Sequence, residues 1–268
     1  MMDLDAYFRR IGYSGSRAPT LETLAALHAL HPTAIPFENL DTLRGAPVRL
    51  DLDSLERKLV RQRRGGYCFE QNLLFTHVLT ALGFRVVGLS ARVIWERVDD
   101  APRPRTHMLL LVPVGGESYL CDVGFGGLTM TGPLRLTLEG EQRTPHETFR
   151  LARDGGDYLS QANVRGDWRT LYSFDLQEQL LPDIEVANFY VAQHPESPFR
   201  SRLIAARRDG DRTLKLRDGE LTIQHRSGSR EKRELESVAE LRAALDELFG
   251  IDVPADPALD AALAPLLA

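Results

Sequence analysis

The stretch from Arg64 to Asn72 reads RGGYCFEQN, a double glycine followed by a cysteine at the start of an apolar segment. Glycine adopts backbone angles that are closed to other residues, so Gly65-Gly66 predicts a sharp turn. Residues 69–82 are apolar almost all round, and Gly83 suits a helix C-terminus, so we expect a buried helix with Cys68 in its first turn. Unpaired N–H groups and the helix dipole favour an anion there, which indicates a reactive thiolate. The alternative is a small, buried and inert cysteine.

The histidine best placed to serve this thiol is His107, which opens an apolar strand. A second apolar segment follows the turn sequence PVGG at 113–116, a pattern typical of a hairpin. If the loop is 114–115, or all four residues, His107 lies directly opposite Asp122 on the same face, with Cβ atoms about 5 Å apart. A loop of 115–116 would shift the pairing by two residues and leave a diagonal contact.

Cys68, His107 and Asp122 together would supply a nucleophile, a base and a group that orients the base. Strand alternation turns Cys121 to the face away from Asp122, so we expect Cys121 to pack and not to react. A metal site made from the same three residues lacks the close ligand spacing usual in such sites. We therefore predict a Cys-His-Asp catalytic triad without a metal.

Several stretches of this chain, in the same order, closely resemble the arylamine N-acetyltransferase family. They are YFRRIGY at 7–13, IPFENL at 35–40, RGGYCFEQN at 64–72, THMLL at 106–110, CDVGFGG at 121–127 and HPESPF at 194–199. The resemblance implies acetyl transfer from acetyl-CoA to the nitrogen of arylamines, arylhydrazines or N-hydroxyarylamines. It implies ping-pong kinetics through an acetyl-cysteine, and small-molecule partners only.

The same resemblance implies further site residues. Phe37 and Phe125 would line the acceptor or acyl pocket. A glycine cluster after Asp122 is a candidate for the approach of the coenzyme A pyrophosphate, since nests of backbone N–H groups bind phosphate oxygens. Independently of the resemblance, the polar, proline-stiffened loop 99–105 leads straight to His107, so it should lie over the active site; the alternative is an exposed connector. The remaining candidates are Gly124, Gly126 and Gly127 for the coenzyme, and Arg105 and Thr106 for the substrate.

Composition excludes several other classes of protein. The chain has 268 residues, is 43% apolar, and has a net charge of -5 with a pI near 5.8, which argues against a nucleic-acid binder. The N-terminus lacks a signal-peptide pattern, and no span of about 18 apolar residues occurs. We expect a soluble, cytoplasmic protein without membrane contact, in which two cysteines stay reduced.

The order of patterns predicts an α+β fold in three parts. Residues 1–84 read as a helical bundle that carries the cysteine. Residues 85–200 read as short strands with glycine turns, which favour an antiparallel β-barrel carrying the histidine and aspartate. Residues 201–268 read as a small α/β unit. The resemblance implies that this unit forms a lid over the active-site cleft. The resemblance also implies a cysteine-protease-like catalytic core.

Two other functions use the same residues. A cysteine hydrolase of transglutaminase, protease or thioesterase type would differ only in admitting water to the intermediate. A non-enzymatic small-molecule-binding protein could keep the scaffold without the reaction. The sequence departs from the family at Ala192–Pro195, which lack the expected hydroxyl residues, and beyond 200 the likeness is weak. Acyl-donor preference, acceptor range and oligomeric state therefore stay open.

Overall fold

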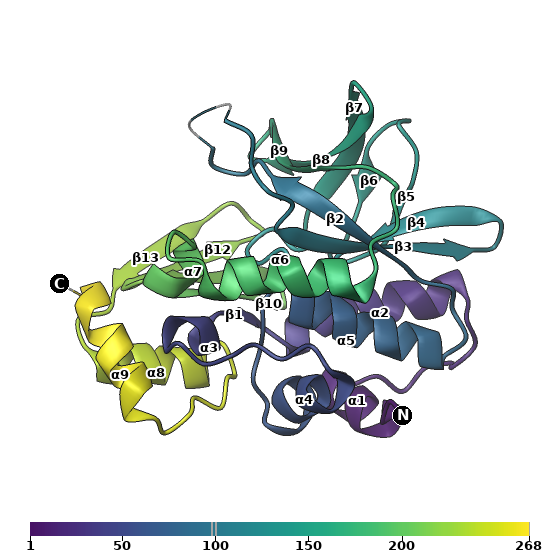
Figure 1. Cartoon of the computed structure of the whole chain (residues 1–268). Helices are drawn as coiled ribbons and strands as arrows, with labels where there is room; N and C mark the ends of the chain where they lie inside the picture. The colour runs from purple at the N-terminus through teal and green to yellow at the C-terminus, as the bar shows by residue number, and fades with distance from the viewer. Residues whose placement is uncertain (98, 100, 268) are drawn as a thin grey trace.

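The computed structural model describes residues 1–97, 99 and 101–267. Figure 1 shows a group of N-terminal helices, a strongly curled sheet above them, and a second sheet with the C-terminal helices to one side. The predicted loop 99–105 and the predicted unit 201–268 include Asp100 and Ala268, which lie outside the described residues.

The first third of the chain is helical, as predicted. Two of its helices begin at side-chain caps, since the side chain of Thr20 accepts from the backbone N–H of Thr23 and that of Asp51 accepts from the backbone N–H of Ser54. Their apolar faces meet around Phe69 and Phe75, which are fully buried. These elements are α1 (Leu4–Ile11), α2 (Leu21–Ala34), α3 (Leu40–Leu43), α4 (Leu52–Leu55), a π-helical turn η1 (Glu56–Arg61) and α5 (Cys68–Ala81).

The curled sheet has eight antiparallel strands in the order β5-β4-β3-β2-β9-β8-β7-β6. At its two edges the Gln142 side chain accepts from the backbone N–H of Arg135 and donates to the carbonyl of Arg135, which links β6 to β5 and nearly closes a barrel. The strands are β2 (Val87–Val93), β3 (His107–Val114), β4 (Glu117–Cys121), β5 (Leu134–Arg135), β6 (Gln142–Arg143), β7 (Thr148–Asp154), β8 (Asp157–Val164) and β9 (Asp167–Phe174). The predicted antiparallel barrel is confirmed.

The second sheet has five strands in the order β1-β10-β11-β12-β13 and its own apolar core. Its first strand was not expected, because β1 (Phe37–Glu38) lies within residues 1–84, which we predicted as a helical bundle. The sheet comprises β1, β10 (Ile204–Asp209), β11 (Arg212–Arg217), β12 (Glu220–His225) and β13 (Arg230–Glu234), and is covered by α8 (Val238–Glu247), α9 (Pro257–Leu263) and η2 (Ala264–Leu267). The division at 84 and 200 stays a prediction, although β1 and α3 pack with the third part.

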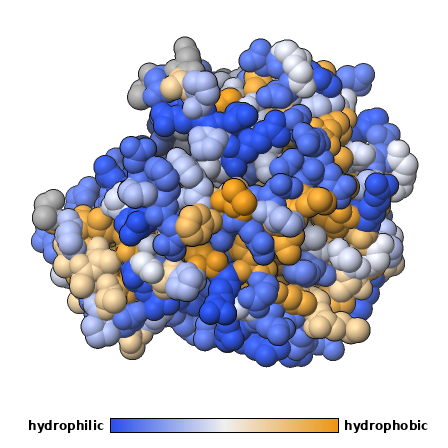
Figure 2. Space-filling model, viewed as in Figure 1, coloured by the Kyte–Doolittle hydropathy of each residue, from blue (hydrophilic) through white to orange (hydrophobic). Residues whose placement is uncertain are grey.

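Two helices join the barrel to the second sheet: α6 (Leu181–Gln193) and α7 (Pro198–Ser201). Figure 1 shows α6 crossing the front of the molecule, and Figure 2 shows apolar residues gathered in the middle of this face. Val186 and Phe189 of α6 are the most exposed apolar side chains there, at 72% and 69%. In the described part of the chain, no helix combines the length and hydropathy that a membrane crossing needs.

Candidate active site

Cys68 is the first residue of α5 and is 4% exposed. The turn before it is fixed by Glu70, whose side chain accepts from the backbone N–H of Tyr67 at 3.1 Å. The sulfur lies 3.7 Å from the carbonyl oxygen of Thr106, at the start of β3. The thiol therefore sits at the positive end of a buried helix, beside the strand that carries His107.

The double-glycine turn is held against the 35–38 segment by Gln71. Its side-chain amide donates to the carbonyls of Pro36 and Gly66, at 2.8 and 3.2 Å. A side chain at Gly65 is impossible here, since an ideal Cβ would lie 2.1 Å from the carbonyl oxygen of Pro36. Glycine at this position thus lets two backbone segments meet next to the nucleophile.

A buried ion-pair network lies beneath this turn. Arg64 contacts the carboxylate of Glu38 at 2.7 Å and that of Asp41 at 3.2 Å. Lys58 contacts Asp41 at 2.7 Å and Glu70 at 2.6 Å. The network ties η1, β1 and the start of α5 together.

His107 opens β3 and Asp122 directly follows β4, but they are not cross-strand partners. The hairpin pairs Leu110 with Cys121 and Val114 with Glu117, so its loop is Gly115-Gly116. The directly opposed register that we favoured is wrong, and the register shifted by two residues is the one observed. Both loop glycines have positive φ, at 63° and 84°, which suits them to this two-residue turn.

The diagonal arrangement still brings the two side chains together. His107 Nε2 donates to Asp122 Oδ2 at 2.7 Å, with the side chains 3% and 0% exposed. The other oxygen of Asp122 accepts from Asn72 at 3.2 Å and from the backbone of Gly124 at 3.0 Å. The carboxylate is thus held by three donors.

Asn72 is a site residue that our sequence reasoning did not single out. Its amide nitrogen donates to the carbonyl of Met108 as well as to Asp122, and its oxygen accepts from the backbone of Val123 at 3.1 Å. It lies four residues after Cys68 in the same helix, on the face that points to the β3–β4 hairpin. That spacing is the signal that could have identified it.

Burial and charge oppose each other in the histidine and aspartate. Burial by itself would lower the pKa of His107, but the charge and hydrogen bond of Asp122, with a further interaction from the Cys68 thiol, raise that pKa to about 10. Burial would raise the pKa of Asp122, yet the charge of His107 and the hydrogen bonds from His107, Gly124 and Asn72 together outweigh burial and hold that pKa below its usual value. The pair is therefore an imidazolium facing a carboxylate, with the second ring nitrogen left for the thiol.

A cavity of about 550 Å³ opens in front of Cys68 and His107. Most of the predicted substrate and coenzyme residues line it: Phe37, Thr106, Gly124, Phe125, Gly126 and Gly127. Arg105 is not among the described residues of the lining, because its guanidinium pairs with Asp175 at 2.6 Å, while Arg103 and Pro104 do face the cavity. Phe125 and Tyr172 pack on the imidazole, with ring centroids 5.2 and 4.9 Å away.

Two of the glycines after Asp122 lie in close contact with other parts of the protein. An ideal Cβ at Gly124 would lie 2.7 Å from Cys68 Cα, and one at Gly127 would lie 2.6 Å from Lys215 Cε. The N–H of Gly124 already serves Asp122. The hypothesis of a coenzyme approach therefore narrows to Gly126 and Gly127.

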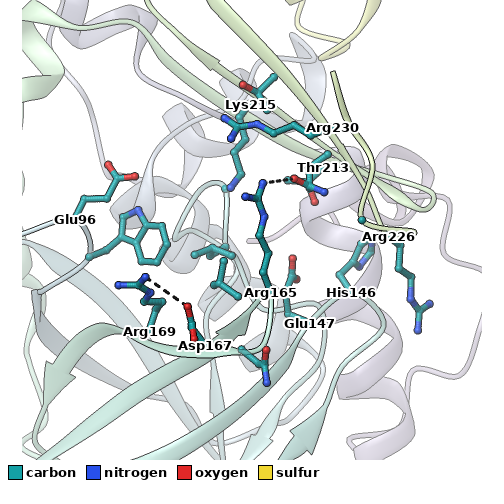
Figure 3. A pocket seen from close by; sticks show the side chains of 18 of the residues that line it. Glu96, His146, Glu147, Arg165, Asp167, Arg169, Thr213, Lys215, Arg226 and Arg230 are labelled. Carbon is teal, nitrogen blue, oxygen red and sulfur yellow. Dashed lines mark hydrogen bonds and ion pairs between the residues drawn. The ribbon is translucent and has the colours of Figure 1, made fainter. Parts of the chain in front are cut away.

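A second cavity, of about 850 Å³, lies between the turn joining β8 to β9 and the strands β11 to β13 (Figure 3). Its lining carries six arginine or lysine residues against four aspartate or glutamate residues, so it is a basic cleft in an acidic protein. The two cavities share the residues Trp95, Glu96, Arg97, Gly127, Leu128 and Lys215. Sequence reasoning missed this cleft, whose basic residues come from separate strands and turns. Among the described residues, no group of His, Cys, Asp or Glu is arranged to hold a metal ion.

Comparisons with known proteins agree on one family. The sequence model of the N-acetyltransferase family matches residues 20–258. The chain is 47% identical to the arylamine N-acetyltransferase of Mycolicibacterium smegmatis, over 94% of this chain and 93% of that protein. It is 42% identical to the arylamine N-acetyltransferase / N-hydroxyarylamine O-acetyltransferase of Salmonella typhimurium, over 93% and 89%.

Solved structures are similar over their whole length. The arylamine N-acetyltransferase of M. tuberculosis matches with a TM-score of 0.94 and 44% identity, covering 98% of this chain and 100% of that chain. The Mycobacterium marinum arylamine N-acetyltransferase in complex with CoA matches with a TM-score of 0.95 and 41% identity, covering 99% and 100%. The fold thus agrees with those structures over nearly the whole chain, at 41–44% sequence identity.

Proposed function

Because the chain belongs to the arylamine N-acetyltransferase family, we propose that it moves the acetyl group of acetyl-CoA to the nitrogen of an arylamine or arylhydrazine, or to the oxygen of an N-hydroxyarylamine, through an acetyl-cysteine. The observation that carries the proposal is the His107–Asp122 hydrogen bond of 2.7 Å beside the Cys68 thiol, in a cavity open to a basic cleft. This arrangement suits a thiolate stabilised by an imidazolium that a carboxylate holds in place.

In the first half-reaction the Cys68 thiolate attacks the thioester carbonyl carbon. The carbon–sulfur bond to coenzyme A breaks, and the imidazolium of His107 gives its proton to the departing thiolate, so that coenzyme A leaves as a thiol. The backbone N–H of Cys68, at the first position of α5, is our candidate donor to the oxyanion. The product of this step is an acetyl thioester on Cys68 and a neutral His107.

In the second half-reaction the nitrogen of the acceptor attacks the acetyl-cysteine. Neutral His107 takes the proton from that nitrogen as the bond forms, and the carbon–sulfur bond to Cys68 breaks to release the amide. The thiolate and imidazolium are then restored. Asp122 stays ionised throughout, because its role is to hold the tautomer and orientation of the ring.

The aromatic acceptor is proposed to lie between Phe37 and Phe125, with Thr106 as a further contact. Phe37 forms an edge contact with Phe199 at 6.0 Å between ring centroids, and Phe125 packs at the edge of the His107 ring. Flat apolar walls next to a nucleophile suit an arylamine better than a peptide. Arg105 would act on the substrate only by leaving its ion pair with Asp175.

The nucleotide end of coenzyme A is proposed to occupy the basic cleft. Coenzyme A carries several phosphate charges, and the cleft is the large basic cavity that adjoins the cavity of Cys68. Gly126 and Gly127 line the route between the thiol and this cleft. The pantetheine arm would cross their backbone on its way to the sulfur.

The test is a two-substrate kinetic analysis combined with intact mass spectrometry. We expect parallel lines in double-reciprocal plots of rate against acetyl-CoA at several arylamine concentrations, and one added acetyl group on Cys68 when the amine is omitted. Intersecting lines with an unmodified Cys68 would contradict the scheme. Rapid acetyl-CoA consumption without any amine would instead identify a hydrolase.

A further inference from the structure

Lys215 lies in the middle strand of the five-stranded sheet, at the border between the two cavities. It is a residue of β11, paired with Ala206 of β10 and Thr222 of β12. In Figure 3 its side chain runs from the sheet into the basic cleft. It lines the cavity of Cys68 as well as the cleft, so a ligand that spans both must pass it.

The stem of Lys215 rests on Gly127. An ideal Cβ at Gly127 would come within 2.6 Å of Lys215 Cε and 3.2 Å of Nζ, so the absence of a side chain there makes room for the lysine. The backbone of the glycine turn and the ammonium group therefore form one side of the passage together.

The ammonium of Lys215 lacks a counterion among residues 1–97, 99 and 101–267. The two carboxylates whose charges act on Lys215 are already paired: Glu147 pairs with Arg208 at 2.6 Å, and Glu96 pairs with Arg217 at 3.4 Å. Burial, and then the charge of Arg208, lower the pKa of Lys215 from its usual value. A partly buried ammonium without a carboxylate partner is a binding group for an anion that comes from outside the protein.

We infer that Lys215 binds the pyrophosphate of the acyl-CoA donor, an inference that rests on the proposed function. The acyl end of the donor must reach Cys68 and the adenosine end suits the larger cleft, so the middle of the molecule crosses the border where Lys215 lies. The pyrophosphate is the charged group in that middle part, whereas pantetheine is neutral. An ammonium forms charge-assisted hydrogen bonds with phosphate oxygens.

The test compares donors that keep or lack the pyrophosphate in the variants Lys215→Gln and Lys215→Met. Acetyl-CoA, its 3′-dephospho form and acetyl-pantetheine are assayed with one arylamine. We expect the ratio of kcat/KM for acetyl-CoA to kcat/KM for acetyl-pantetheine to fall about tenfold, the effect of one lost charge-assisted hydrogen bond. In the Lys215 variants, kcat/KM for the 3′-dephospho donor should fall by the same factor as kcat/KM for acetyl-CoA. In both cases we expect KM to rise and kcat to stay unchanged.

Lys215→Met keeps an apolar side chain packed on Gly127, so this variant should fold as the wild type does. Thermal unfolding of both Lys215 variants checks that their stability is unchanged. Arg212→Gln, on the same strand and paired with Asp209, removes a positive charge outside both cavities and is the matched control. The assignment would be overturned if the ratio of kcat/KM for acetyl-CoA to kcat/KM for acetyl-pantetheine stayed unchanged in both Lys215 variants. It would also be overturned if kcat/KM for the 3′-dephospho donor did not fall in them. Failure of the wild-type protein to form acetyl-Cys68 from any donor would instead refute the proposed function.

Discussion

His107 and Asp122 meet at 2.7 Å across the β3–β4 hairpin although neither is the cross-strand partner of the other. The strand β4 ends at Cys121, and Asp122 leaves the sheet in a turn that the side chain of Asn72 and the N–H of Gly124 hold. The carboxylate is therefore placed by contacts from α5 and from the following turn as much as by the hairpin.

Replacing Asp122 with asparagine should lower kcat/KM for acetyl transfer by at least about 10³-fold, because the ring of His107 loses the acceptor that holds its tautomer and charge. Steady-state kinetics with acetyl-CoA and an arylamine measure this loss. Asp175→Asn, which removes the partner of Arg105 outside the Cys68 cavity, is the matched control and should lose far less. Equal losses in the two variants would refute a special role for Asp122.

The stability that the pair contributes should depend on pH in a defined window. The pKa of His107 is raised to about 10, so its contribution is complete below the ordinary value of 6.5 and is lost as pH rises toward 10. The pKa of Asp122 is lowered, so its contribution is present above 3.8 and is lost as pH falls below that value. We expect urea unfolding to show a larger advantage of wild type over Asp122→Asn at about pH 5.5 than at about pH 9.5. A constant difference would contradict the raised pKa.

Gly124→Ala should damage both stability and activity. Its Cβ would lie 2.7 Å from Cys68 Cα, so the turn or the start of α5 must move, at a cost of about 1–3 kcal/mol. Gly156→Ala is the matched control, since an ideal Cβ at Gly156 has no atom within 4 Å. Thermal unfolding and acetyl transfer are measured on both variants; a Gly124→Ala protein as stable and active as the control would show that the contact can relax freely.

Arg64→Met should destabilise the fold by about 3–5 kcal/mol, because Arg64 is the ion-pair partner of the fully buried Glu38, whereas Asp41 keeps its contact with Lys58. Arg17→Met removes the exposed pair with Asp5 and should cost less than about 1 kcal/mol. The two side chains of the first pair are 5% and 0% exposed, and those of the second are 58% and 64% exposed. Urea denaturation measures the free energy of unfolding of both variants. Similar losses in Arg64→Met and Arg17→Met would mean that burial of an ion pair does not govern its contribution to stability.

The two cysteines should react differently with iodoacetamide. Cys68 lines the open cavity beside His107, whereas Cys121 is fully buried. Burial, and then the charge of Asp122, raise the pKa of the Cys121 thiol. At neutral pH we expect one alkyl group on Cys68 and none on Cys121, as measured by peptide mapping. Acetyl-transfer activity should fall in proportion to the alkylated fraction of Cys68. Faster labelling of Cys121 would contradict this assignment.

Local patterns in the sequence were enough to predict the family, the helical start, the antiparallel barrel and the helix that begins at the cysteine. These features depend on residues close together in the chain: glycine turns, caps such as Thr20 and Asp51, and the spacing of apolar side chains. The family motifs are likewise short and contiguous.

Tertiary structure alone decided which distant residues meet. The two-residue loop Gly115-Gly116 set the hairpin register, and β1 left the helical segment to join the sheet of β10, because backbone hydrogen bonds form wherever packing brings strand edges together. Long-range contacts of this kind also place Asn72 beside Asp122, place Lys215 between the two cavities and form the basic cleft. A one-dimensional pattern shows which side chains a chain carries, whereas their distances are set by how its elements pack.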